Sequence, residues 1–287
     1  MKKENKLWAY FVICYFAFIF IIYWWNMVAI HTPWYDELYT YAHFISQGPL
    51  FVATHWPLPN NHILFNLLSS FVYLITKNNI ISLRLISYFF FVLSCLLLYF
   101  WLSKDYDKKT GLIASVAFSL CLYTHDLGIQ GRGYSLANFL FLTALLSCIR
   151  IVQNRNQKGI WFIAWSFSIT MAVYDIPSNL YWIMLLYICT IFQIRKDFTA
   201  IIKYTFFSFI SAAATCVLYL PVWYVLGEYS GMTEPPIPLI GTMSIPVAGA
   251  IHSEKETIRK RERCLSAQRR DHQSRLCLLQ FRIVFSQ

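Results

Sequence analysis

The chain has 287 residues and a formal net charge of +10; 57% of its residues are apolar, 18% are aromatic and only 13% are charged. Soluble domains carry roughly a quarter charged residues, so this composition excludes an ordinary soluble globular protein. Long continuous apolar runs also exclude a membrane β-barrel, whose strands alternate in segments of about ten residues. The sequence therefore predicts an all-α polytopic membrane protein.

The apolar runs predict seven transmembrane helices. A bilayer needs about 20 residues per helix, so the third and fifth runs are short, and each could instead be a re-entrant segment. The first run follows a basic N-terminus but is about 24 residues long, which predicts a retained helix and not a cleaved signal peptide. The predicted spans are residues 7–30, 82–102, 111–124, 134–152, 160–174, 179–194 and 200–226.

Basic residues set the predicted orientation. If every predicted span crosses the membrane, four basic clusters fall on one side, and the positive-inside rule makes that side cytoplasmic. The N-terminus is then cytoplasmic and the opposite loops are extracytoplasmic. This placement also explains the net positive charge without nucleic-acid binding. The clusters are Lys2, Lys3 and Lys6; Lys104, Lys108 and Lys109; Arg150, Arg155 and Lys158; and Arg195, Lys196 and Lys203.

The first outer loop, residues 31–81, is long. Its stretches 39–45 and 63–75 are predicted to be helices lying in the membrane interface, separated by Gly- and Pro-containing breaks. A crossing by residues 63–75 is the alternative, but it would place the later basic clusters outside.

The chain changes character after residue 250. We interpret residues 1–250 as the N-terminal part of a membrane domain and residues 251–287 as a basic, Arg-rich tail that is not native sequence, such as a frameshift product. By the span count this tail begins outside, against the charge pattern of the preceding residues.

Cysteine usage gives no sign of a metal site. Six of the eight cysteines fall inside or beside apolar runs, where cysteine behaves as a small hydrophobe. No CxxC pair or Cys/His cluster has metal-site spacing. The sequence therefore predicts no metal centre built on cysteine.

Four sequence blocks occur in order along the outer loops. They are Tyr35-Asp36-Glu37-Leu38-Tyr39-Thr40-Tyr41, Pro59-Asn60-Asn61-His62-Ile63-Leu64-Phe65-Asn66, Leu83-Arg84-Leu85-Ile86-Ser87 and Gln130-Gly131-Arg132-Gly133-Tyr134-Ser135-Leu136. Over about residues 1–225 the chain resembles the C-type membrane glycosyltransferases, in the bacterial branch related to protein O-mannosyltransferases and lipid A aminoarabinose transferases. Gln130 stands where that family often has an acid, and the family normally continues for several more spans, so the chain resembles a C-terminally truncated member.

The resemblance implies an enzyme of the bacterial inner (plasma) membrane with an extracytoplasmic active site. It would transfer a sugar from a polyprenyl-phosphate donor to a lipid, glycan or protein acceptor, with inversion. A weakly nucleophilic hydroxyl needs a positioned base, for which Asp36 is the candidate. Arg132 would hold the departing lipid phosphate in bidentate fashion. Glu37 would orient Asp36 or bind a metal, while Asn61, His62 and Tyr134 would contact substrate.

No cofactor is required by these residues. Hard divalent ions favour carboxylate oxygens, so a divalent metal at Asp36 and Glu37 stays open, although two adjacent carboxylates are too few to demand one.

Each candidate also has a structural interpretation. The Asp36-Glu37 pair could cap a helix, Arg132 could snorkel to the interface and His62 could bond the start of a helix. His55, Asp126 and Asp175 are interpreted as ordinary polar loop groups. The rival functions are a secondary transporter or flippase, for which we find no internal repeat, and an inactive truncated membrane remnant.

Overall fold

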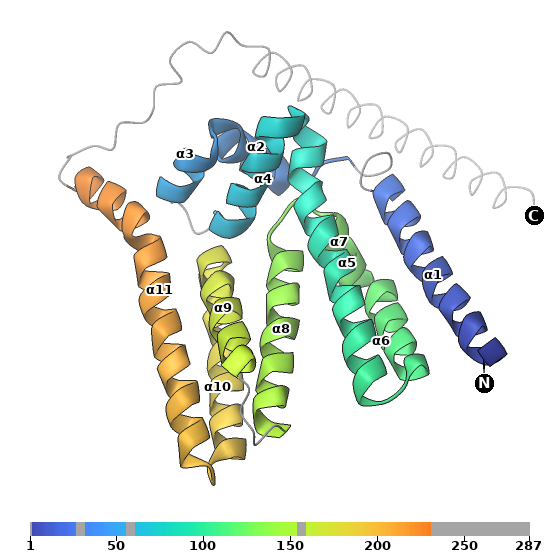
Figure 1. Cartoon of the computed structure of the whole chain (residues 1–287). Helices are drawn as coiled ribbons and strands as arrows, with labels where there is room; N and C mark the ends of the chain where they lie inside the picture. Colours follow the sequence, from blue (N-terminus) through green and yellow to red (C-terminus); the bar gives the residue numbers. More distant parts are fainter. Residues whose placement is uncertain (1, 27–31, 56–60, 154–158, 231–287) are drawn as a thin grey trace, which may run out of the picture. The chain divides into compact units, whose positions relative to one another are not determined.

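The helices of this protein follow its apolar runs. The computed structural model describes residues 2–26, 32–55, 61–153 and 159–230, all within one unit, Met1–Met232. The predicted tail at 251–287 lies outside the described residues. Every regular element in the described ranges is helical (Figure 1), which confirms the all-α class. The elements are α1 (Lys2–Trp25), α2 (Tyr35–His43), η2 (Ile45–Gln47), α3 (Pro49–Thr54), α4 (Ile63–Thr76), α5 (Asn79–Asp105), α6 (Lys108–Leu120), α7 (Leu122–Ile129), α8 (Tyr134–Gln153), α9 (Gly159–Asp175), η3 (Pro177–Asn179), α10 (Leu180–Ile194) and α11 (Phe198–Ser230).

All seven predicted spans are helical over the residues that the structure describes, which leave out 27–30 of the first span, but they differ in length. Five segments in the described ranges are long and apolar enough to cross a membrane: Trp8–Trp25, Asn79–Asp105, Tyr134–Gln153, Pro177–Ile194 and Phe198–Val225. The predicted third span is a pair of helices, α6 and α7, bent by 69° at their junction, and counting it as one span gives six. The predicted fifth span is α9, whose 17 residues are short for a bilayer.

The two predicted interfacial stretches form helices α2 and α4. The Lys77 backbone, at φ 52°, ends α4 in the left-handed conformation that commonly terminates helices. With 14 residues, α4 is too short to span a membrane alone. This length favours the interfacial interpretation over the crossing alternative.

Three apolar clusters hold the helices together, and the third packs α3 and α4 against α9 and α11. The largest one joins α4, α8, α9, α10 and α11 around fully buried Trp165 and Tyr204, whose rings lie 5.0 Å apart. The second one joins α1, α5 and α7 around Tyr23 and Phe91, stacked at 4.4 Å. Many other large apolar side chains on these helices point outward, as expected for a protein whose solvent is lipid.

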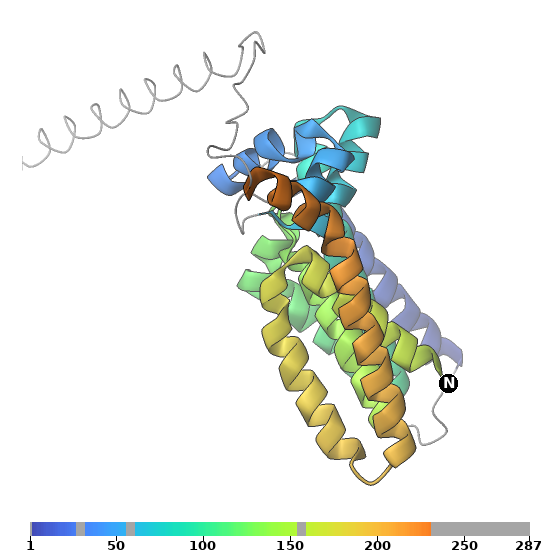
Figure 2. The same cartoon turned by 90° about the vertical axis from the view of Figure 1, so that its left-hand side faces the viewer.

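The ends of the helical bundle differ in chemistry. Figures 1 and 2 place α2, α3 and α4 at one end and the α10–α11 connection at the other. The start of α1 and the α5–α6 connection lie at the same end as α10–α11 (Figure 1). At that end Arg150 of α8 also forms an ion pair with Asp105 of α5, at 2.5 Å. The described connections that carry basic residues thus gather at one end, and the candidate residues of the first outer loop lie at the other.

We expect the end that carries α2 to be extracytoplasmic, because the opposite end holds the basic connections. In a background without the native cysteines, Ser46→Cys, in η2, should react with an impermeant thiol reagent added to intact cells. Its matched control is Lys196→Cys, an exposed site between α10 and α11, which should react only after permeabilisation. The reverse labelling pattern would overturn the orientation.

Candidate functional site

Glu37 is the most heavily bonded side chain at this end of the molecule. Its Oε1 accepts hydrogen bonds from Nε of Arg84 at 3.0 Å and from the backbone N–H of Gly131 at 2.5 Å. Its Oε2 accepts from Nη2 of Arg84 at 3.0 Å and from the backbone N–H of Trp34 at 2.8 Å. Both side chains of the ion pair are about 1% exposed. Four donors therefore occupy a buried carboxylate that no substrate reaches.

This burial bears on the two predicted roles of Glu37, which were orienting Asp36 and binding a metal. A divalent cation takes several free oxygen ligands, and both oxygens of Glu37 are already occupied. Within the described residues, no group of three or more His, Cys, Asp and Glu side chains gathers where it could hold a metal. Asp36 and Glu37 therefore do not fit a shared metal site. Of the two predicted roles of Glu37, its hydrogen bonds favour orienting Asp36 over binding a metal.

Gly131 permits the close approach on which this arrangement depends. A Cβ atom at this position would lie 2.8 Å from the backbone oxygen of Leu83 and 3.0 Å from Oε1 of Glu37. Contacts this short with backbone cannot relax cheaply, because the helix that carries Leu83 would have to move. The glycine thus lets the α7–α8 connection pack directly on α5 and donate to Glu37.

Arg132 and Asp36 meet beside this ion pair. Nη1 of Arg132 lies 3.7 Å from Oδ2 of Asp36; the Arg side chain is 7% exposed and the Asp side chain 61% exposed. The backbone oxygen of Arg132 accepts from Oγ of Ser87 at 2.9 Å, which fixes the loop to α5. The ring of Tyr134 lies 5.9 Å from Cζ of Arg132. Gln130, where the resembled family often has an acid, cannot be a charged partner of Arg132. Asp36 lies close enough to be its carboxylate partner.

His62 lies against the same arginine. Its Nδ1 accepts from the backbone N–H of Gly133 at 3.0 Å, and its Nε2 lies 3.5 Å from Nη2 of Arg132. Its ring meets that of Tyr134 edge to face at 5.1 Å. Burial, with a smaller contribution from the Arg132 charge, lowers the pKa of His62 to about 3. The imidazole is therefore neutral at physiological pH.

Asp175 is built into the same end of the bundle, although its sequence context indicated an ordinary loop group. Its side chain is fully buried, and Oδ1 accepts from the backbone N–H of Phe65 at 2.9 Å, in the first turn of α4. A Cβ on Gly133 would lie 2.7 Å from Oδ2 of Asp175 and 2.7 Å from Nδ1 of His62. Asp175 thus ties the end of α9 to the start of α4 and packs against the loop that binds His62. The one available signal was its position at the end of an apolar run.

Asn61 belongs to the scaffold and not to the substrate surface. Its Nδ2 donates to the backbone oxygens of Val52 at 3.3 Å and His55 at 2.9 Å, and its Oδ1 accepts from Asn66 at 2.7 Å. With 1% of its surface exposed, its amide joins α3 to α4. We therefore revise its predicted substrate contact. Asp36, Arg132, His62 and Tyr134 remain together as the candidate site.

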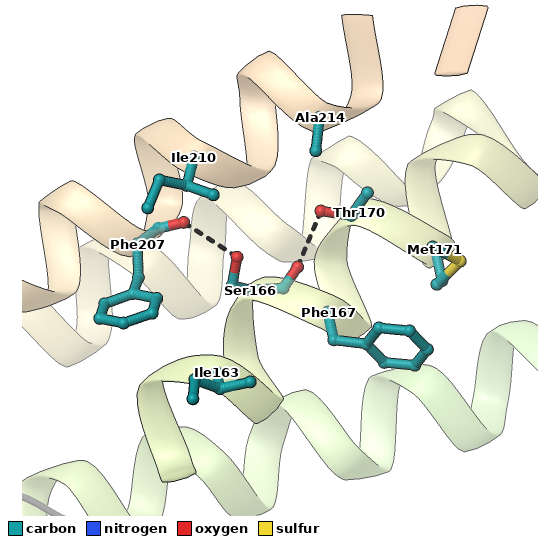
Figure 3. A pocket seen from close by; sticks show the side chains of 8 residues that line it. All are labelled: Ile163, Ser166, Phe167, Thr170, Met171, Phe207, Ile210 and Ala214. Atoms are coloured by element: carbon teal, nitrogen blue, oxygen red, sulfur yellow. Dashed lines mark hydrogen bonds between the residues drawn. The ribbon is translucent and has the colours of Figure 1, made fainter. Parts of the chain in front are cut away.

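A separate apolar hollow of about 330 Å³ lies between α9 and α11 (Figure 3). Its polar groups are satisfied internally: Oγ of Ser166 donates to the backbone oxygen of Phe207 at 3.1 Å, and Oγ1 of Thr170 donates to that of Ser166 at 2.8 Å. The other lining side chains are apolar. It contains none of the predicted site residues, so we keep it apart from the candidate site.

The fold and its exposed apolar helices define the class as an all-α polytopic membrane protein. No protein-family model matches the chain, and neither a curated protein nor a solved structure matches it. The four sequence blocks and the geometry that brings them together are therefore the only guides to function.

Glu37→Gln should be strongly destabilising, because it leaves the Arg84 charge buried without a counter-charge. Breaking one side of a buried ion pair costs roughly 3–5 kcal/mol. The matched control is Asp105→Asn, which breaks the more exposed pair with Arg150 at the other end. Thermal unfolding in detergent should show a clearly larger fall in Tm for Glu37→Gln. Equal falls would contradict the central role of the Glu37–Arg84 pair.

Proposed function

We propose that the protein is a membrane glycosyltransferase that moves a sugar from a polyprenyl-phosphate donor to an extracytoplasmic lipid, glycan or protein acceptor. One observation carries the proposal: an exposed carboxylate, Asp36, lies 3.7 Å from the buried guanidinium of Arg132. Transfer from a phosphate-linked sugar requires two groups: a base that the acceptor can reach and a fixed cation for the phosphate. Asp36 and Arg132 supply this pair.

In the proposed reaction, the oxygen of an acceptor hydroxyl forms a bond to the anomeric carbon while Asp36 takes the proton of that hydroxyl. The bond from that carbon to the phosphate oxygen breaks, and its electron pair leaves with the lipid phosphate. The Arg132 guanidinium offsets the charge that develops there. Attack from the side opposite the leaving group inverts the anomeric centre.

The contact between Asp36 and Arg132 also suggests how the donor enters. At 3.7 Å the pair is longer than a charge-assisted hydrogen bond. A phosphate oxygen at normal bonding distance would therefore displace the Asp36 side chain, which is free to move because more than half of it is exposed. Donor binding would then separate the base from the cation and place the sugar between them.

The position of these groups suits a donor anchored in lipid. Near the site, Trp34 just before α2, Tyr35 and Leu38 on α2 and Leu50 on α3 are all exposed. Exposed aromatic and apolar side chains of this kind favour the membrane–water interface. A headgroup that extends from the bilayer at this end would meet Arg132 without leaving the membrane.

A secondary transporter is the second candidate, because α6 and α7 form a broken helix bent by 69°. Transporters place such breaks around midplane binding sites. The two functions separate in one assay: reconstituted protein that moves a sugar across vesicles without transferring it to an acceptor would favour transport.

Asp36→Asn should lower the transfer rate on the order of 10²–10⁴-fold, because the amide cannot accept the acceptor's proton. Donor binding should change little. Asp126→Asn, another exposed aspartate that lies on α7, is the matched control and should retain activity. Radiolabelled sugar transfer by purified protein measures both. Near-full activity of Asp36→Asn would remove it from the role of base.

Arg132→Lys should lose much of the activity and Arg132→Ala nearly all of it, because an ammonium keeps the charge but not the planar fork. The loss should appear in donor binding or in the chemical step, with protein abundance unchanged. Arg195→Ala, at the opposite end of the bundle, controls for the loss of one positive charge. Normal binding and turnover of a polyprenyl-phosphate sugar by Arg132→Ala would exclude the phosphate role.

A further inference from the structure

The two nitrogens of the His62 ring have different partners, and this difference fixes where the ring carries its hydrogen. Nδ1 is 3.0 Å from the backbone nitrogen of Gly133. A backbone N–H is always a donor, so Nδ1 must be the acceptor and carries no hydrogen. In the neutral ring the hydrogen is then on Nε2. The lowered pKa, about 3, agrees with a neutral ring.

In this tautomer, both groups at the contact between His62 and Arg132 are hydrogen-bond donors. All guanidinium nitrogens donate and none accepts. Nε2–H of His62 and Nη2 of Arg132, 3.5 Å apart, therefore cannot hydrogen-bond to each other. An acceptor atom that reaches Nε2–H of His62 on the side of Arg132 also comes within reach of the guanidinium, whatever else Arg132 contacts.

We propose that His62, as a neutral Nε2–H donor, joins Arg132 in binding one oxygen of a phosphate group. The shared chemistry is a phosphate oxygen; that it belongs to a lipid-linked phosphate rests on the proposed function. A phosphate oxygen has several lone pairs and accepts from two donors at once. One cation and one neutral donor also match the single negative charge of a sugar phosphodiester.

Packing holds the ring in this orientation. The Cα of Gly133 lies so close to His62 and Asp175 that an added Cβ would be 2.7 Å from each. The Tyr134 ring covers another side of the imidazole. The groups around His62 are therefore the Arg132 guanidinium, the Tyr134 ring from the start of α8 and the buried carboxyl of Asp175 from the end of α9. A flipped ring would place the Cδ2–H group against the Gly133 N–H, which would then lose its acceptor.

Two substitutions separate the two ring nitrogens. The side-chain amide of Gln reaches the position of Nε2, so His62→Gln keeps a donor toward Arg132. The shorter Asn places its amide near Nδ1, so His62→Asn keeps the acceptor for Gly133 and loses the donor. Binding of a polyprenyl monophosphate to the full chain in detergent, followed by tryptophan fluorescence, measures the difference. Inorganic phosphate is the second probe.

We expect His62→Asn to weaken binding on the order of tenfold or more, the effect of losing one hydrogen bond to a charged group. His62→Gln should stay within about threefold of the wild type, because it keeps a hydrogen bond of the same kind. Unchanged binding by His62→Asn would overturn the inference, and so would equal losses in both variants at unchanged Tm. If His62→Asn bound normally while Asp36→Asn abolished transfer, the inference alone would fail.

The remaining outcomes concern the source of the phosphate and the fold. If inorganic phosphate bound as tightly as the lipid phosphate, with the same dependence on His62, the donor assignment would be wrong and the lipid-linked source would be rejected. If neither probe bound the wild type, both proposals would fail. Nitrogen-15 NMR of histidine-labelled wild type reports which ring nitrogen of His62 carries the hydrogen, and a variant is needed only to assign the signal. A hydrogen found on Nδ1 would refute the inference.

Discussion

The bidentate ion pair between Glu37 and Arg84 is the constraint on which the candidate site depends. It joins the first turn of α2 to α5, and the Gly131 N–H adds the α7–α8 connection to the same carboxylate. Successive residues of a helix point about 100° apart. Once Glu37 is fixed inward, Asp36 must point out of the protein, where its carboxylate is exposed. The hydrogen-bonding of one acid therefore determines the accessibility of the other.

The site is assembled from segments far apart in the chain, so its geometry is a property of helix packing. His62 precedes α4, Arg132 precedes α8 and Asp175 ends α9. Each is held by a backbone N–H or by a buried side chain of another segment, as Gly133 holds His62. A loss of packing between α8 and α9 would displace the guanidinium without touching it. Stability and the proposed chemistry are therefore coupled at this end of the bundle.

The helices could be predicted from the sequence because long apolar runs are a strong signal, and the four blocks identified most of the residues that meet. The burial of Glu37 and the exposure of Asp36 could not be predicted. Adjacent carboxylates look equivalent until the partner is placed, and Arg84 lies 47 residues away in sequence. The burial of Asn61 and Asp175 could not be predicted for the same reason, since it depends on partners in other segments of the chain. The bend between α6 and α7 had no Pro or Gly at the junction to signal it.

The Gly131-Arg132-Gly133 turn is anchored by its main chain. Its first and third N–H groups donate to Glu37 and His62, so the arginine between them is held from both sides before its side chain makes any contact. Main-chain donors are common to every amino acid except proline, so this anchor does not depend on the chemistry of the central side chain. A different residue could occupy position 132 with its Cα in the same place. The scaffold could thus present another functional group to another ligand, and the specificity of the turn could diverge while its shape is inherited.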